Sequence, residues 1–292
     1  MEYSNNTKPL FGPSGHSEKY LQEYSATIDM PKWIANQGLE LFEYSFGKGV
    51  RLTEATASKI GNEAEKYGIE ISVHAPYFIS FASLEQEKVD NSIGYLVASL
   101  KALRCLKGER CVFHTGSEGG KPRNEAYARA KDAFIRALYE IKEQGLDDML
   151  VCPETMGKSA QIGTVEEIIE LCKLGNNVYP CIDFGHVNAL YGGILKNQDD
   201  FQCIVDKLFD GLGEIKTKNM HVHFSKIQYG PKGEIKHLTF EDTVYGPEFD
   251  AFAEVIVKNG LTPHILSESA GTQSDDAITM KQIWQSRLNF SI

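Results

Sequence analysis

The sequence predicts an α/β fold, a single (β/α)8 TIM barrel formed by residues 1–292. Eight short apolar runs alternate with segments of helical periodicity, which is the pattern of repeated strand–helix units. No Ser/Gly-rich linker, low-complexity tract or block of charge separates these units. The length of 292 residues suits one barrel, because such barrels commonly use about 250 residues. We therefore expect one barrel in one domain.

The eight expected strands are short, and most are followed by a polar residue. In chain order they cover residues 9–12, 39–44, 70–74, 110–114, 149–153, 178–182, 219–224 and 264–266. The longest irregular segments follow the third, fourth and seventh strands, at residues 77–84, 115–123 and 226–246. All three lie on the C-terminal side of the strands, where active sites of barrels are built. We expect the functional residues at that end.

The expected helices begin and end at recognisable capping residues. They cover residues 31–37, 54–67, 85–106, 124–144, 200–212, 247–259 and 274–288, with one more beginning after Thr164. Thr53 and Thr164 are suitable N-caps, since a threonine hydroxyl accepts from the free N–H groups of the first turn. Gly68 and Gly260 are suitable C-terminal stops.

Histidines and carboxylates recur where the expected strands end. They are His74, His114, Glu154, Asp183, His186, His221, His223 and Glu268, joined by Glu234 and His237 on the loop after the seventh strand. A single histidine or glutamate at such a position is more often a structural group than a ligand. Burying so many ionisable groups at one rim without cations would be prohibitive. The set as a whole therefore predicts a metal site.

Mixed nitrogen and oxygen ligands favour Zn²⁺, with Mn²⁺ or Fe²⁺ suitable for part of the site. The ligands outnumber what one ion holds, which indicates two or three metals. His221 and His223 point the same way because strand residues alternate between faces. The residue nearer the barrel mouth is the easier ligand, and the sequence leaves open which of the two binds. We interpret His16 as a solvated loop residue and His264 as a structural one.

Composition narrows the functional class. The net charge of −10 argues against a large nucleic-acid-binding surface. It does not exclude a local basic rim or a phosphate site formed by bound cations. Residues 1–7 have neither a basic nor an apolar signal region, and no run of about 18 apolar residues occurs. The six cysteines form no CxxC pair, which predicts buried thiols in a reducing cytosol and a cytoplasmic location.

Seven short motifs resemble the endonuclease IV family of apurinic/apyrimidinic endonucleases, within the xylose-isomerase-like TIM barrels. They are SVHAPY at 72–77, FHTG at 113–116, PET at 153–155, IDFGH at 182–186, HVHFSK at 221–226, GEIKH at 233–237 and SES at 267–269. Their order and spacing cover nearly all of the chain between residues 39 and 268.

The resemblance implies three zinc ions and a role for each ligand. His74 and His114 would bind the first ion, and Glu154 would bridge it to the second. Asp183, Glu268 and a histidine of the seventh strand would complete the second site, and His186 and His237 the third. The family has an Asp-x-His pair after the seventh strand, whereas this chain has Glu234 three residues before His237. Either Glu234 replaces that aspartate or the third metal is held differently.

The resemblance also implies hydrolysis of the DNA phosphodiester 5′ to an abasic sugar, as in base excision repair, with Glu154 and Glu268 as catalytic carboxylates. Tyr77 matches a family tyrosine on the DNA-binding surface. Lys48 and Arg51 would contact phosphates, together with further cations at Lys121, Arg123, Lys158, Lys226 and Lys232. The implied partner is double-stranded DNA with abasic sites. We expect a monomer without membrane association.

A sugar isomerase or epimerase of the same superfamily is the alternative. It needs one divalent metal, which Glu154, Asp183, His223 and Glu268 would hold, and the acidic net charge suits it. It has no use for His74, His114, His186 and His237. A barrel that only binds a small ligand is a third possibility, but it would give this ligand set no physical purpose.

Overall fold

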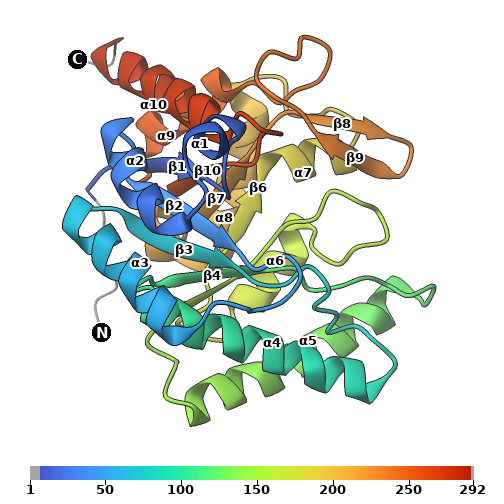
Figure 1. The fold of residues 1–292 in the computed structure, drawn as a ribbon. Helices are drawn as coiled ribbons and strands as arrows, with labels where there is room; N and C mark the ends of the chain where they lie inside the picture. The colour runs from blue at the N-terminus through green and yellow to red at the C-terminus, as the bar shows by residue number, and fades with distance from the viewer. Residues whose placement is uncertain (1–6, 291–292) are drawn as a thin grey trace.

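The computed structural model describes residues 7–290. Residues 1–6, which carried most of the expectation that no signal region is present, lie outside the described part. Eight parallel strands form two hydrogen-bonded sheets, ordered β1-β10-β7-β6 and β2-β3-β4-β5. Ser14 bridges to Glu43 at one seam, and Val151 and Glu154 bridge to Val178 and Cys181 at the other. The strands therefore close into the predicted barrel, drawn in Figure 1.

All eight expected strands are present, with ends shifted by up to three residues. The barrel strands are β1 (Leu10–Pro13), β2 (Leu41–Ser45), β3 (Glu70–His74), β4 (Arg110–Phe113), β5 (Leu150–Pro153), β6 (Cys181–Asp183), β7 (His221–Phe224) and β10 (His264–Ser267). Leu266 and Asp183 both pair with His223 across neighbouring strands. This register brings the ends of β6, β7 and β10 to one level at the mouth.

The helices surround the barrel, as Figure 1 shows. They are α1 (Glu18–Glu23), α2 (Met30–Asn36), α3 (Glu54–Tyr67), α4 (Gln86–Cys105), α5 (Arg123–Glu143), α6 (Val165–Cys172), α7 (Phe184–Leu190), α8 (Gln198–Lys218), α9 (Phe249–Asn259) and α10 (Gln273–Phe290), with a 3-10 turn at Thr27–Asp29. Thr53 and Thr164 cap α3 and α6, and Gly68 and Gly260 end α3 and α9 in left-handed conformation. These four capping predictions are confirmed. Within residues 7–290 no helix has the length and apolarity needed to cross a membrane.

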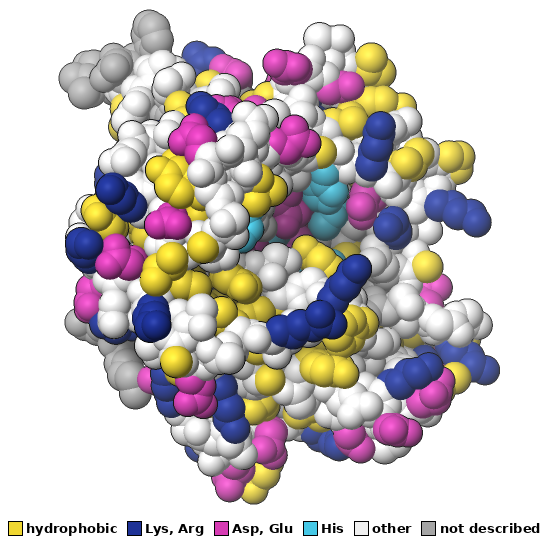
Figure 2. Space-filling model, in the orientation of Figure 1, with side chains coloured by type: hydrophobic (Ala, Val, Ile, Leu, Met, Phe, Trp, Pro, Cys, Tyr) yellow, Lys and Arg dark blue, Asp and Glu magenta, His cyan; other side chains and the backbone are white. Residues whose placement is uncertain are grey.

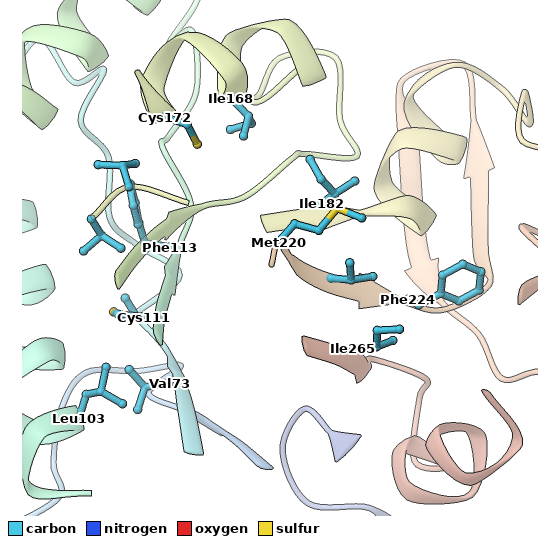
Figure 3. Close-up of a cluster of buried hydrophobic side chains, with 14 of the residues drawn as sticks. Val73, Leu103, Cys111, Phe113, Ile168, Cys172, Ile182, Met220, Phe224 and Ile265 are labelled. Carbon is cyan, nitrogen blue, oxygen red and sulfur yellow. The ribbon is translucent and has the colours of Figure 1, made fainter. Parts of the chain in front are cut away.

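The main core lies between the strands and the helices. Figure 3 shows strand side chains such as Val73, Phe113 and Ile265 in one buried cluster with helix residues such as Leu103 and Ile168. Because side chains alternate along a strand, the neighbouring positions point into the barrel. Polar residues at those inward positions are therefore held by a rigid apolar frame.

The segment 226–246, expected to be irregular, contains a hairpin. Its antiparallel strands are β8 (Ile227–Gly230) and β9 (Gly233–His237). The strands are short and half polar, so the sequence lacks the alternation that marks a strand. The expectation of an irregular loop is wrong for this segment.

Three further expectations need correction. His186 lies in the first turn of α7 rather than at a strand end, because the Asp183 carboxylate caps that helix by accepting from the backbone N–H of His186. Helix α8 extends to Lys218 across a non-helical Gly213. All six cysteines are free, but Cys203 is exposed and Cys105 is partly exposed. The prediction of buried thiols holds only for the other four.

Candidate metal centre

A hollow of about 600 Å³ opens at the C-terminal mouth of the barrel. Figure 2 shows histidines and acidic side chains at its floor and several Lys or Arg side chains around its edge. Six of the predicted ligands line it, namely His74, His114, His186, Glu234, His237 and Glu268. Residues distant in the sequence, from several strand ends, α7 and the hairpin, therefore meet in this hollow.

The first group of possible ligands consists of His74, His114 and Glu154. The Nε2 atoms of His74 and His114 lie 3.1 Å and 3.0 Å from the same oxygen, Oε2 of Glu154. The Nδ1 of His74 donates to the carbonyl of Ala75 at 2.8 Å. That hydrogen bond places the ring proton on Nδ1, so Nε2 presents its lone pair to the carboxylate.

The second group consists of Glu154, Asp183, His223 and Glu268. The Nδ1 of His223 lies 3.0 Å from Oε1 of Glu154 and 3.4 Å from Oε1 of Glu268. Glu154 therefore belongs to both groups, with Oε2 in the first and Oε1 in the second. His223 lies in this group, and His221 lies one step deeper in the barrel beside Glu43.

The third group consists of His186, Glu234 and His237. Glu234 and His237 come from the hairpin strand β9, which hydrogen-bonds to the loop after β5 through Glu234 N–H and the Gly157 carbonyl at 2.8 Å. The Nε2 of His186 lies 3.5 Å from Oε2 of Glu234. The hairpin thus brings to the mouth the two residues that the sequence placed on a loop.

Unpaired polar atoms show that these residues fit a metal. Oδ2 of Asp183 is fully buried and accepts no hydrogen bond. Neutral His74 and the carboxylate of Glu154 would face each other with lone pairs at 3.1 Å, an arrangement that is stable only with a proton or a cation between them. Nitrogen and carboxylate donors in groups of three and four match the preferences of Zn²⁺ and similar ions.

The electrostatics of the hollow lead to the same conclusion. Burial, together with the nearby charges of Glu268 and Glu154, raises the pKa of Asp183 to about 8. Burial lowers the pKa of His186, but Asp183 and Glu154 overcome it and raise that pKa to about 10. Both pKa values are raised because buried carboxylates crowd this part of the hollow, and a bound cation would stabilise their ionised form directly.

Glu43 belongs to the site but was missed by sequence reasoning. It lies on β2, is fully buried, and contacts His221, His223, Ser14 and Ser72. The motifs of the sequence gave no weight to this strand, although both Glu40 and Glu43 interrupt its apolar run. The interruption at the inward position, Glu43, was the available signal.

The predicted DNA-binding residues lie beside the hollow. Tyr77 is 53% exposed, its ring centroid lies 4.9 Å from that of His74, and its hydroxyl contacts Ser45. Lys48 and Arg51 are exposed and line an adjoining hollow of about 360 Å³, which also includes Ser45. The three side chains therefore form part of one rim.

Other candidate residues have partners of their own. Arg123 makes two hydrogen bonds to Glu167, and Lys226 is buried against Glu248. Neither cation is free to contact a phosphate in this conformation. His16 lies in a loop, as expected, but it is partly buried, stacks on Tyr20 and contacts the Thr27 hydroxyl, so the interpretation of a solvated residue holds only in part. His264 contacts Glu70 at the far end of the barrel, as a structural histidine would.

The comparisons with known proteins identify relatives over most of the chain. The sequence profile of the family described as "Xylose isomerase-like TIM barrel" matches residues 31–284. An uncharacterized protein of Methanocaldococcus jannaschii is 33% identical over 260 residues, which cover 86% of this chain and 91% of that protein. A probable endonuclease 4 of Sulfurihydrogenibium sp. is 29% identical over 63% of this chain and 66% of that protein. A further probable endonuclease 4, from Streptomyces avermitilis, is matched over about half its length.

Solved structures share the fold. A D-tagatose 3-epimerase-like protein superposes with a TM-score of 0.71 at 24% identity, covering 96% of this chain and 97% of that one. Endonuclease IV from Thermus thermophilus superposes with a TM-score of 0.69 at 17% identity, covering 96% of this chain and 99% of that one. At these identities the likeness establishes the barrel fold but not the reaction, which depends on the residues of the site.

Proposed function

Because the chain belongs to the xylose isomerase-like TIM-barrel family, we propose that it is a metal-dependent DNA endonuclease that cleaves the phosphodiester 5′ to an abasic site. One observation carries the proposal, namely three adjoining groups of possible metal ligands arranged around Glu154. Its sequence relatives named as probable endonuclease 4 support the same function.

The number of ligand groups favours phosphodiester hydrolysis over sugar chemistry. A one-metal isomerase requires only the group of Glu154, Asp183, His223 and Glu268. The same hollow also contains His74 and His186, which are buried, and His114 and His237, which are partly buried. Polar groups withdrawn from water without a ligand to bind would be costly there. Several adjacent cations suit a phosphodiester, whose attacking and departing oxygens both need stabilisation.

We propose Zn²⁺ as the metal and assign one ion to each of the three groups described above. A fourth possible group, Cys181, His221 and His223, shares His223 with the second group and is assigned no ion of its own. When bound, such ions would supply the Lewis acidity that activates water near neutral pH and neutralises phosphate charge. The chain's own residues orient the ligands: the Ala75 carbonyl fixes the His74 ring, and the Thr155 carbonyl fixes that of His186. Glu154 and Glu268 are the proposed catalytic carboxylates.

The rim supplies the proposed contacts to double-stranded DNA. Tyr77 offers an exposed aromatic face for the sugar or a neighbouring base, and Lys48 and Arg51 offer positive charge for phosphates. The abasic site as target, the monomeric state and a cytoplasmic location are parts of the proposal that come from the resemblance to the endonuclease IV family.

Sugar epimerisation is the second candidate, because the group around Asp183 and His223 is complete by itself and the hollow is large enough for a monosaccharide. In that case a metal would polarise a carbonyl while a carboxylate moves the proton. The net charge of −10 also suits a neutral substrate.

The decisive experiment compares two substrates with one metal-loaded preparation. We expect incision of a duplex with a single abasic site, no incision of the same duplex without it, and loss of activity in Asp183→Asn. Ketose epimerisation is measured in parallel. Epimerase activity without incision, in a preparation whose metal content has been determined, would overturn the nuclease proposal.

A further inference from the structure

We propose that Glu43 is a positioning residue that fixes the ring of His223 so that its Nδ1 atom faces the metal. The inference deepens the proposed function, since it rests on metal binding at the group of Glu154, Asp183, His223 and Glu268. Glu43 comes from β2, on the side of the barrel opposite β6, and its side chain is completely buried.

The contacts of Glu43 saturate its carboxylate. Oε1 lies 2.9 Å from Nε2 of His223 and accepts from the Ser14 hydroxyl at 3.0 Å. Oε2 lies 3.1 Å from Nε2 of His221 and accepts from the Ser72 hydroxyl at 2.9 Å. With one imidazole and one hydroxyl on each oxygen, Glu43 is fully occupied within the protein. It therefore acts through its neighbours rather than as a ligand.

The geometry of His223 shows what Glu43 controls. The two nitrogens of the ring face opposite ways, Nε2 towards Glu43 and Nδ1 towards Glu154 and Glu268 at 3.0 Å and 3.4 Å. A carboxylate beside Nε2 holds the proton on that nitrogen, which leaves the lone pair on Nδ1 for a metal. The Nε2 contact has a short distance but not the angle of a hydrogen bond, so the main restraint is the electrostatic attraction between the Glu43 carboxylate and the N–H dipole of the ring.

A purely structural role does not explain a carboxylate at this position. Leu41, the preceding inward residue of β2, packs against Leu10 and Leu266 and fills the barrel with apolar atoms. Replacing a buried ionic cluster by apolar side chains is often neutral or stabilising. Ser14, which donates to Glu43, also contacts a proposed ligand, because its hydroxyl lies 3.4 Å from Oε1 of Glu268. Glu43 thus touches one proposed ligand and is linked to a second.

The test measures metal affinity in Glu43→Gln, with Glu70→Gln as the matched control. Glu70 also pairs with a histidine, since its Oε2 lies 3.1 Å from Nε2 of His264, but it does so at the other end of the barrel. Metal-free protein is titrated with Zn²⁺ against a chromophoric chelator, and the Co²⁺-loaded protein is recorded by visible absorption.

We expect Glu43→Gln to weaken binding of one ion per chain by about 10–100-fold and to change the ligand-field bands of that Co²⁺ ion. Glu70→Gln should leave both readouts within about twofold of the unsubstituted chain, because it lies outside the ligand shell. If Glu43→Gln does not fold, as judged by circular dichroism of the metal-free protein, Ser72→Ala replaces it and should weaken the same ion several-fold. Equal affinity and equal spectra in the folded variant and the control would overturn the inference.

The outcome separates this inference from the proposed function. Metal affinity and Co²⁺ spectra require no DNA, so a chain that fails to incise abasic DNA can still show the loss in Glu43→Gln. Conversely, a chain that incises DNA while Glu43→Gln binds metal normally would retain the nuclease proposal and lose this one.

Discussion

At the scale of single residues, the carboxylates have different roles according to their partners. Glu167 accepts two hydrogen bonds from Arg123 and two more from the backbone N–H groups of Gly163 and Thr164. Asp183, by contrast, leaves one buried oxygen without a hydrogen bond, although Nδ1 of His186 lies 3.3 Å from it. The contacts of Glu167 are complete without a ligand, and those of Asp183 are not. We therefore expect removal of the charge to lower the stability of the fold at Glu167 and to lower metal affinity at Asp183.

Glu167→Gln should destabilise the fold by about 1–3 kcal/mol at pH 7, because it replaces a charged acceptor of several hydrogen bonds. Burial opposes ionisation, but Arg123 and the helix N-terminus lower the pKa of Glu167 below its ordinary value of 4.5. A lowered folded-state pKa gives stability that is present above the unfolded-state value and is lost as the pH falls. Urea unfolding at pH 7 and pH 4 should therefore show a difference that shrinks at the lower pH.

The control is Glu170→Gln on the same helix, whose partner Lys173 is at the surface. We expect that variant to change stability by less than about 0.5 kcal/mol at either pH. A difference for Glu167→Gln that stayed constant between pH 7 and pH 4 would contradict the assigned cause.

Asp183→Asn should lower metal affinity without lowering the stability of the metal-free fold. The amide oxygen can still accept from the His186 N–H and cap α7. The substitution removes the attraction between Asp183 and His186, but it also removes a carboxylate whose pKa burial raises to about 8, so the relieved cost of burial offsets the lost contact. Calorimetric Zn²⁺ titration and thermal unfolding in the presence of a chelator measure the two effects. A large loss of stability in the metal-free variant would assign Asp183 a structural role.

At the scale of elements, the hairpin β8–β9 illustrates where sequence reasoning stops. The strands that end in His74, His114 and Glu154 were predicted from local patterns, because apolar runs and capping residues mark them. The position of β9 depends instead on a close backbone approach, since a Cβ on Gly233 would lie 2.0 Å from the Gly157 carbonyl oxygen. No local pattern encodes that contact, so the sequence placed Glu234 and His237 on a loop without a fixed geometry.

Gly233→Ala should detach the hairpin from the loop after β5 and empty the third ligand group. The added methyl would clash with backbone, and the φ of +91° disfavours any other residue. We expect the variant to bind one metal ion fewer per chain while the groups around Glu154 remain filled, as measured by elemental analysis after gel filtration.

Gly230→Ala is the matched control in the same hairpin, because its added methyl would meet only the flexible end of Ile235 at 3.3 Å. It should keep the full metal content. Equal metal content in both variants would show that the third group does not depend on the docking of the hairpin.

At the scale of the whole molecule, the repeated strand–helix pattern was sufficient to predict the barrel, and the barrel was sufficient to predict which end carries the site. It was not sufficient to predict Glu43, because its partner His221 on β7 is 178 positions away in the chain. Sequence reasoning therefore named residues that a strand end marks, and these residues meet in the hollow. It missed a residue that contacts them only because closure of the barrel brings distant strands together. The assignment of residues 1–292 to a single domain stays a prediction.

A chain with a net charge of −10 can bind DNA only if positive charge is concentrated where the DNA lies. Lys48 and Arg51 meet this condition, since both are exposed on the rim beside the ligand groups. Replacing both by alanine should weaken binding to abasic DNA and flatten the dependence of log affinity on log salt by up to about 2, the value for two lost phosphate contacts. Fluorescence anisotropy at several salt concentrations measures both quantities.

The control changes one lysine and one arginine elsewhere, Lys107→Ala with Arg104→Ala, where the chain leaves α4 and enters β4 at the opposite end of the barrel. The two double variants have the same net charge, so a general electrostatic effect would change their affinities equally. If only the Lys48 and Arg51 variant shows a larger loss of affinity and a weaker dependence of affinity on salt, the DNA lies on the mouth of the barrel. The same slope in both would exclude these two residues from phosphate contact and leave the metal groups without a charged rim to guide DNA to them.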